Sequence, residues 1–173
     1  SMIDCSNIHL HQGAVVLHLV SDEESHGHQG MGFLTHKRVI RGDAAIVGEP
    51  TELDPVIAQK GALWLRISTI GKSAHGSRPH TGINAIEKMK KAIDQLNSVS
   101  LEETHPFLGK PTFNIGTIQG GTKVNVVPER CEIEVDRRML PTEEKEKVLR
   151  EIKEALDSLQ IQDSSFQYQM EEI

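Results

Sequence analysis

The feature that most constrains the fold is the hydrophobic periodicity of residues 61–170. Apolar residues recur at every second position in four segments of this stretch, and at intervals of three to four residues in two others. The first period is typical of a strand with one buried face, and the second is typical of an amphipathic helix. The order of the segments predicts strand, helix, strand, strand, helix and strand.

The apolar positions locate each expected element. The four strands carry alternating apolar residues, namely Leu63, Leu65, Ile67 and Ile70, then Phe113, Ile115 and Ile118, then Cys131, Ile133 and Val135, and finally Phe166, Tyr168 and Met170. The two helices carry apolar stripes, namely Ile86, Met89, Ile93 and Leu96, and then Val148, Leu149, Ile152, Leu156 and Leu159. We expect Asn84 to cap the first helix and Thr142 the second. Two helices on one face of a four-stranded antiparallel sheet give the ferredoxin-like arrangement, so the predicted fold class is α+β.

Two acidic turns follow apolar runs nearer the start of the chain. Residues 14–20 predict a strand buried on both faces, and this strand ends at Asp22-Glu23-Glu24. A second run, residues 44–47, ends at Gly48-Glu49-Pro50. Strands of an open α/β sheet present reactive groups beyond their carboxyl ends, so these glutamates could lie side by side. A solvated acidic turn is the alternative, and these residues alone leave it open.

Composition excludes several classes of function. The net charge of −6 and the pI near 5.8 argue against binding to nucleic acid, and the scarcity of aromatic residues argues against a base-stacking surface. No stretch is predicted to cross a membrane, and the first residues do not form a signal peptide. The only cysteines, Cys5 and Cys131, are far apart, so we expect reduced thiols in a cytoplasmic protein.

Five short motifs occur in an order that is familiar from one family. They are Ser21-Asp22-Glu23-Glu24, Val47-Gly48-Glu49-Pro50-Thr51, Gly71-Lys72-Ser73-Ala74-His75-Gly76-Ser77-Arg78-Pro79, Asn125-Val126-Val127-Pro128 and Asp136-Arg137-Arg138. Together they resemble the M20 family of metallopeptidases and amidohydrolases, which includes acetylornithine deacetylase and succinyl-diaminopimelate desuccinylase. The resemblance covers nearly all of the chain after about residue 14.

The resemblance implies a division of the chain and an activity. Residues 1–55 would be a partial metallohydrolase catalytic domain, and residues 56–173 a ferredoxin-like lid through which the protein forms a homodimer. The implied parent is a dinuclear zinc hydrolase, with Co²⁺ or Mn²⁺ as alternative metals. It would cleave the amide bond of an N-acylated amino acid or a short peptide by attack of a metal-activated water.

The resemblance also implies roles for three glutamates. Glu23 would be the general base that takes a proton from the metal-bound water, while Glu24 would ligate one metal and Glu49 the other. Carboxylates are suitable Zn²⁺ ligands, and a metal-bound water near neutral pKa needs a base close by. His26 and His28 flank Gly27 beside these acids, but the family has no metal-binding histidine there, so we interpret them as loop residues.

Three further residues match positions that contact the substrate. His75 would donate a hydrogen bond to the oxyanion of the tetrahedral intermediate, often across the dimer. Asn125 would bind the substrate, and Arg138 would bind its free carboxylate. Arg137 should point to the other face of the sheet, because successive side chains of a strand alternate. A surface ion pair of Arg138 with Glu134 or Asp136 is the alternative reading.

Two departures from the family pattern support a second hypothesis. The His-x-Asp segment and bridging Asp that precede the acidic turn in the family are missing, and so is the final histidine ligand. We therefore expect this chain to be a fragment that contains the lid and is inactive by itself. In the alternative hypothesis, the chain as given is a dimerisation and substrate-binding module that folds without metal.

Overall fold

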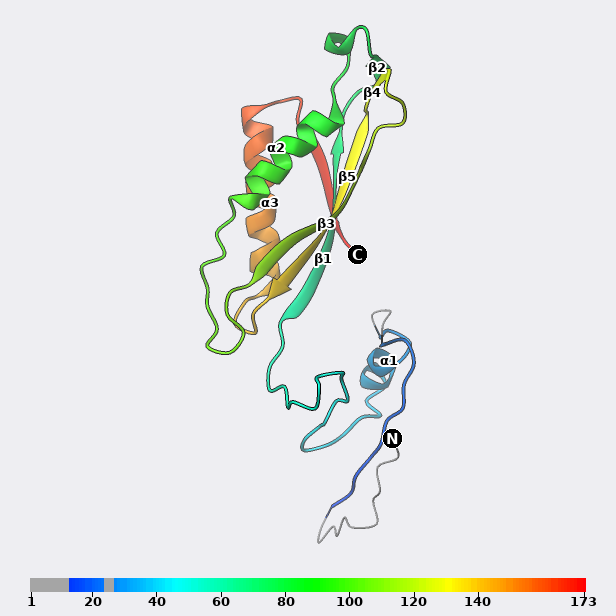
Figure 1. Ribbon diagram of the computed structural model, residues 1–173, viewed down its shortest axis with the longest axis vertical. Helices are drawn as coiled ribbons and strands as arrows, with labels where there is room; N and C mark the ends of the chain where they lie inside the picture. Colours follow the sequence, from blue (N-terminus) through cyan, green and yellow to red (C-terminus); the bar gives the residue numbers. More distant parts are fainter. Residues whose placement is uncertain (1–12, 24–26) are drawn as a thin grey trace. The chain divides into compact units, whose positions relative to one another are not determined.

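In the computed structural model, residues 13–23 and 27–173 are described, and the chain divides between Pro50 and Thr51 into two compact units (Figure 1). The described part of the first unit contains one short helix, α1 (Met31–His36). None of its residues is buried, so the helix contributes no core of its own.

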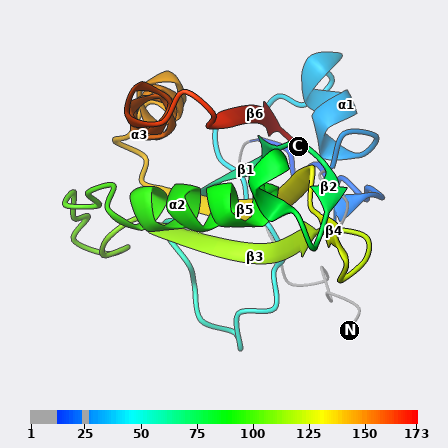
Figure 2. The ribbon, with the colours of Figure 1, turned by 90° about the horizontal axis from the view of Figure 1, so that it is seen from above.

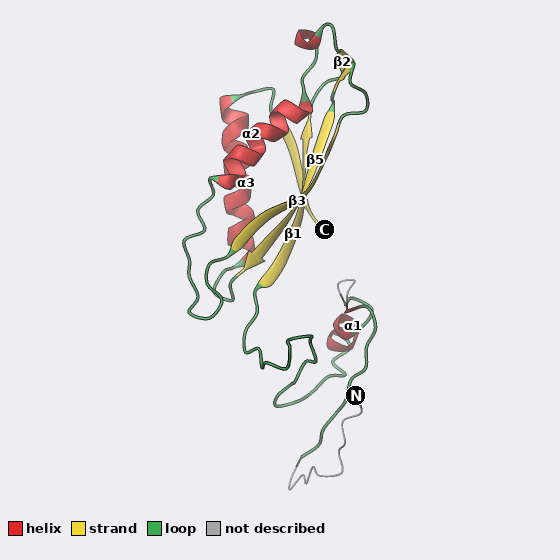
Figure 3. Ribbon diagram, in the orientation of Figure 1, coloured by secondary structure: helices red, strands yellow, loops and turns green. Residues whose placement is uncertain are grey.

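The prediction of buried strands at residues 14–20 and 44–47 is wrong. Both segments run as loop in Figure 3, and their apolar side chains face solvent, with Leu19 86% and Ile46 102% exposed. A strand is stable only with a hydrogen-bonded neighbour, and the described residues of the first unit contain no strand that could pair with either segment. The partial α/β sheet expected in residues 1–55 is therefore not formed by the described residues.

The second unit has the predicted ferredoxin-like topology. Its main elements follow the expected order, namely β1 (Gly61–Ile70), α2 (Ala85–Asn97), β3 (Thr112–Gly120), β5 (Arg130–Met139), α3 (Lys145–Gln162) and β6 (Gln167–Glu172). The sheet order is β3-β5-β1-β6 with every neighbouring pair antiparallel. Both helices cover the same face, and Figure 2 shows β3 and β6 at opposite edges. The α+β prediction is confirmed for this unit.

The buried core lies between the sheet and the two helices. It takes side chains from alternate positions of β1 and β5 and from the facing stripes of α2 and α3, and its largest members include Leu63, Leu65, Ile67, Met89, Leu96, Ile133, Ile152, Leu156 and Phe166. These positions confirm most of the predicted apolar stripes. Ile86 is an exception, because it lies in the first turn of α2 beside Gly120 and is 40% exposed. Cys131 is a buried free thiol, and burial raises its pKa.

The two helices begin differently. Asn84 caps α2 as predicted, because its side-chain oxygen accepts hydrogen bonds from the N–H groups of Ile86 at 2.9 Å and Glu87 at 3.3 Å. The predicted cap at Thr142 is wrong, since α3 begins at Lys145 and the Thr142 hydroxyl donates to Glu103 at 3.2 Å.

The late start of α3 has a physical cause. The Glu143 carboxylate accepts the Leu140 N–H at 2.7 Å and forms an ion pair with the buried guanidinium of Arg137. These two bonds hold the segment after β5 in a turn, so the helix starts only after that turn is complete.

Among the described residues, no helix is both long and apolar enough to span a membrane.

A small ribbon extends beyond one end of the main sheet. It consists of β2 (Ala74–His75) paired antiparallel with β4 (Val126–Val127). The short 3₁₀ helix η3 (Pro79–Thr81) follows β2 in the chain. The Ala85 N–H donates to the Pro128 carbonyl at 2.9 Å, which joins this ribbon to the start of α2. The ribbon lies at the top of Figure 1 and carries two of the residues singled out in the sequence.

Candidate functional site

The predicted metal and base residues lie in the first unit. Glu23 and Glu49 are both exposed, and Glu24 lies outside the described residues. Carboxylates are donors that Zn²⁺ accepts, but a zinc site takes three or four protein ligands. No group of three or more His, Cys, Asp or Glu side chains that could hold a metal occurs within residues 13–23 and 27–173. The described carboxylates therefore do not form a complete metal centre by themselves.

His75 and Asn125 lie together in the β2–β4 ribbon. The backbone pairs His75 with Val126, and the Gly76 N–H donates to the Asn125 carbonyl at 2.8 Å. A Cβ atom at Gly76 would lie 3.0 Å from the Asn125 backbone, so a larger residue would push the two segments apart by a few tenths of an ångström. The structure therefore brings these two predicted substrate-contacting residues to one place.

The side chain of His75 has its own partner within the same turn. Its Nδ1 atom lies 2.7 Å from the Ser77 hydroxyl and 3.2 Å from the Ser77 backbone N. Both residues are exposed, so the ring is accessible from solvent. The motif match includes Ser77 but implies no role for it. A hydroxyl two residues after a histidine is the sequence signal that could have indicated this contact, because side chains at such short spacing can hydrogen-bond locally.

The base of the ribbon is held by a second close approach. The Gly71 N–H donates to the Glu129 carbonyl at 2.8 Å, and a Cβ atom at Gly71 would lie 2.1 Å from the Ile83 carbonyl oxygen. Lys72 and Ile83 exchange backbone hydrogen bonds at 2.8 and 2.9 Å. These backbone contacts fix the ribbon relative to the sheet and therefore position His75.

Arg138 lies at the opposite end of the sheet. It pairs with Ala62 of β1 and Thr112 of β3, whereas Arg130, eight residues earlier on β5, pairs with Ile70 next to the ribbon. At about 3.4 Å per residue, Arg138 is roughly 27 Å along the strand from that end. One copy of the chain therefore does not place Arg138 beside His75.

The adjacent arginines Arg137 and Arg138 of β5 point in opposite directions, as predicted. The Arg138 Nε donates to Asp136 at 3.0 Å and its side chain is 43% exposed, so the surface ion pair considered as an alternative is present. Arg137 is only 3% exposed and lies on the helix-covered face, where it pairs with Glu143 and donates to the Arg138 carbonyl. Arg138 is thus the arginine of this pair that a substrate could reach.

The face of the sheet without helices carries a network of charges. Arg66 lies 2.9 Å from both Glu134 and Glu171 and 3.4 Å from Glu132. The hydrogen bond from Arg66 to Glu134 contributes most to the raised pKa of the guanidinium, and the hydrogen bond from Arg130 contributes most to the lowered pKa of Glu132. Alternating charges on the third predicted strand are the sequence signal for this face. Arg66, Glu132, Glu134 and Glu171 pair with one another there, whereas Arg138 pairs with Asp136.

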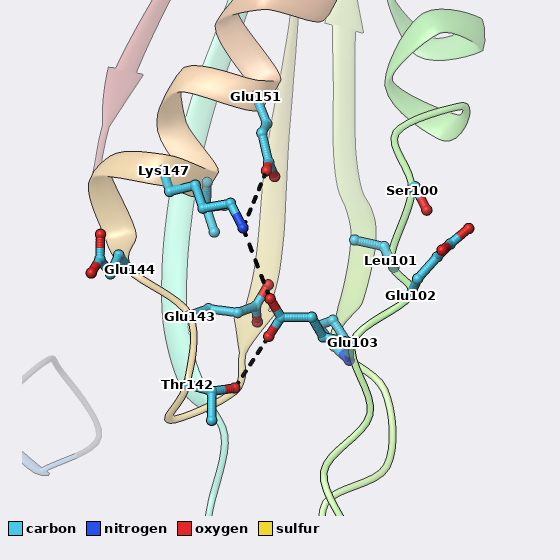
Figure 4. Close-up of a pocket in the computed structure, with 11 residues that line it drawn as sticks. Ser100, Leu101, Glu102, Glu103, Thr142, Glu143, Glu144, Lys147 and Glu151 are labelled. Atoms are coloured by element: carbon cyan, nitrogen blue, oxygen red, sulfur yellow. Dashed lines mark hydrogen bonds and ion pairs between the residues drawn. The ribbon is translucent and has the colours of Figure 1, made fainter.

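A pocket opens elsewhere, between the loop before β3 and the start of α3 (Figure 4). Glu103 bridges its two sides by accepting the Thr142 hydroxyl at 3.2 Å and approaching the Lys147 ammonium at 3.9 Å. Its lining is strongly acidic, with five glutamates, namely Glu102, Glu103, Glu143, Glu144 and Glu151. Because none of the predicted site residues lines this pocket, the candidate site remains with the ribbon and Arg138.

Comparisons with known proteins identify the second unit. Residues 57–164, more than half of the chain, match the family model of the M20 peptidase dimerisation domain. An acetylornithine deacetylase from Photorhabdus laumondii is 38% identical over 129 residues, which cover 71% of this chain and 34% of that protein. An acetylornithine deacetylase from Pasteurella multocida is 39% identical over 127 residues, covering 70% and 33%. The chain thus spans about a third of the length of these curated relatives.

Solved structures agree with this assignment. A putative aminohydrolase from methicillin-resistant Staphylococcus aureus is 28% identical, with a TM-score of 0.56 over 66% of this chain and 30% of that one. An aminobenzoyl-glutamate utilization protein from Klebsiella pneumoniae shares the fold. It is 19% identical, with a TM-score of 0.55 over 66% of this chain and 28% of that one. The chain therefore belongs to the M20 peptidase family and carries its dimerisation domain.

Proposed function

We propose that this chain is part of a dinuclear zinc hydrolase that cleaves the amide bond of an N-acylated amino acid or a short peptide. The observation that carries the proposal is the family match over residues 57–164, together with relatives named as acetylornithine deacetylases. In this proposal Glu23 is the general base, and Glu24 and Glu49 are metal ligands that need further ligands to complete the site. The zinc ions, when bound, supply the activated water. The wide separation of the chain's cysteines supports a cytoplasmic location.

Binding of the substrate in this proposal requires two copies of the chain. Arg138 and the ribbon with His75 and Asn125 lie at opposite ends of the sheet, roughly 27 Å apart along β5. A single amino-acid derivative is much shorter than this distance. If all three residues contact one substrate, Arg138 must come from one copy, and His75 and Asn125 from the other.

The edge strand β3 offers a way to make such a dimer. Its sequence, Thr-Phe-Asn-Ile-Gly-Thr-Ile-Gln-Gly, contains no charge over nine residues, whereas the other edge, β6, ends in Glu171 and Glu172. Uncharged edge strands are open to pairing with another chain, and charges at an edge oppose it. We therefore propose that the homodimer forms by pairing β3 with β3 of a second copy.

The geometry of β3 connects this dimer to the site. Thr112 at its start pairs with Arg138, while Gly120 at its end lies in the hollow formed with Gly76 of the ribbon. A two-fold axis across two identical antiparallel strands places the start of one beside the end of the other. Arg138 of one copy is then adjacent to the ribbon of the other copy, as a shared substrate requires.

Mixing two inactive variants tests this arrangement in a longer protein that contains this chain and a complete metal site. Arg138→Ala and His75→Ala are each expected to lose nearly all activity. When they are mixed and allowed to exchange subunits, half of the dimers combine the two variants, and each such dimer has one intact site. Activity should recover to about a quarter of that of the wild type, from random pairing across a two-fold interface. Absence of recovery, with exchange verified by mass, would show that the site lies within one copy.

The second hypothesis, a module without activity of its own, is favoured by the independence of the second unit. Its core is formed by β1, β5, β6 and both long helices, and the family match lies within it. We propose that the chain alone dimerises but does not turn over substrate. Metal analysis and an assay with N-acetylornithine and dipeptides test this, and stoichiometric zinc with turnover would refute it.

A further inference from the structure

The turn that carries His75 determines which nitrogen of its ring accepts a hydrogen bond. The Arg78 N–H donates to the His75 carbonyl at 2.8 Å, which closes a turn with Ser77 inside it. In this turn the Ser77 backbone N–H points to His75 Nδ1 at 3.2 Å, and the Ser77 hydroxyl lies 2.7 Å from the same atom. Two groups of one residue thus converge on one ring nitrogen.

The chemistry of these groups fixes the proton. A backbone N–H can only donate, so a neutral ring that bonds to it must have a bare Nδ1. The Ser77 hydroxyl can both donate and accept, and toward a bare nitrogen it must donate. The proton of the neutral imidazole is then on Nε2, which becomes its only N–H donor.

We infer that Ser77 is a positioning residue that holds His75 in the tautomer with Nε2–H. This inference rests on the proposed function, in which His75 donates a hydrogen bond to the oxyanion. Donation from Nε2 requires a proton on that atom, whereas the other tautomer would turn a lone pair toward the developing negative charge. Ser77 contacts neither the substrate nor the reacting atoms in this scheme, and it acts through His75.

The surroundings of the turn make this control effective. The backbone of His75 is fixed by its pairing with Val126 and by the bond from the Gly76 N–H to the Asn125 carbonyl at 2.8 Å. The backbone of His75 therefore keeps a constant relation to Ser77 and Asn125, and the two bonds from Ser77 orient the ring. Nearby Thr81 supplies a matched control, since its hydroxyl donates to the Arg78 carbonyl at 2.9 Å and not to the histidine ring.

The tautomer can be measured on this chain without any assay of activity. In two-bond ¹H–¹⁵N spectra at a pH where the ring is neutral, wild-type His75 should show an unprotonated Nδ1 and a protonated Nε2. Ser77→Ala keeps the backbone donor but loses the hydroxyl, and the share of the Nδ1–H tautomer should rise about fivefold, the size expected for one hydrogen bond. Ser77→Thr and Thr81→Val should match the wild type. A mainly Nδ1-protonated ring in the wild type, or no change in Ser77→Ala, would overturn the inference.

Activity in the longer protein separates the failure of this inference from the failure of the proposed function. Ser77→Ala should lower kcat by less than about threefold, in step with the fall in the Nε2–H share, with little change in KM, and Ser77→Thr should restore it. If His75→Ala keeps full activity, the proposed role of the histidine is wrong, whatever the tautomer. If His75→Ala is inactive while Ser77→Ala is fully active despite an altered tautomer, the positioning role of Ser77 is wrong.

Discussion

The segment of residues 14–20 and strand β1 have similar apolar content but different surroundings. In β1, Leu65 and Ile67 are completely buried, because β5 and β6 flank the strand and the helices cover one face. In the first unit, Leu17 and Leu19 face solvent in a segment that pairs with no strand of the described residues. An apolar sequence alone therefore does not make a segment a strand, because the segment also needs a neighbouring strand to pair with.

The largest effect is expected in the core. Phe166→Ala removes a side chain that is fully buried between α2, α3 and the sheet, and it should lower the free energy of unfolding by about 4 kcal/mol. Leu17→Ala, the matched control in the first unit, should change it by less than about 0.5 kcal/mol. Urea unfolding of both variants measures the contrast. Equal losses of unfolding free energy in the two variants would contradict the difference between the two units.

A buried ion pair should come next. Glu143→Ala leaves the Arg137 guanidinium without its carboxylate at a position that is 3% exposed, and it should cost about 3 kcal/mol. The exposed pair of Lys145 with Glu172, 2.7 Å apart, is the control, and Glu172→Ala should cost less than about 1 kcal/mol. Thermal unfolding of the two variants tests this, and a larger loss at Glu172 would contradict it.

The two edges of the sheet should differ in their effect on assembly. Ile118→Lys places a charge at a position of β3 that is 58% exposed, and the two-fold axis would repeat that charge across the interface. The dissociation constant of the dimer should rise roughly 100-fold, because like charges oppose pairing. Gln169→Lys on β6 should leave it unchanged. Analytical ultracentrifugation over a range of concentrations measures both, and dissociation by the β6 variant alone would move the interface to that edge.

The smallest effect is expected at Asp163, which joins the loop before β6 to α2. Hydrogen bonds from Lys88 at 2.7 Å and from Ser165 at 2.6 Å hold the pKa of its carboxyl well below its usual range. A carboxyl with a lowered folded-state pKa stabilises the protein above its unfolded pKa of about 4, and that stability is lost as the pH falls below it. Asp163→Asn should cost about 1 kcal/mol at pH 7, and the cost should shrink toward pH 2. Unfolding curves across this range test the sign, and a cost that grew in acid would contradict it.

The sequence predicted the second unit well because its signals are local. Alternation in β1 and the Asn84 cap of α2 can be recognised within a few residues, and both are confirmed. The strand predicted at residues 14–20 failed because pairing depends on distant segments that periodicity does not describe. The roles of the predicted site residues stay predictions. Their grouping required the strand register, since only pairing shows that Arg138 lies at the end of the main sheet away from the ribbon that carries His75.

The backbone contacts of the ribbon have a consequence for folding. The bonds from Gly71 N–H to Glu129 and from Ala85 N–H to Pro128 lie directly beyond the pairing of Ile70 with Arg130, so they depend on the β1–β5 pair being formed first. The ribbon is also short, with Val127 as its buried apolar side chain among β2 and β4. It should therefore form after the sheet and helices have assembled, and its amides should exchange with solvent sooner than those of β1. The geometry around His75 should therefore form late in folding, and it should be lost early by local unfolding when the protein is destabilised.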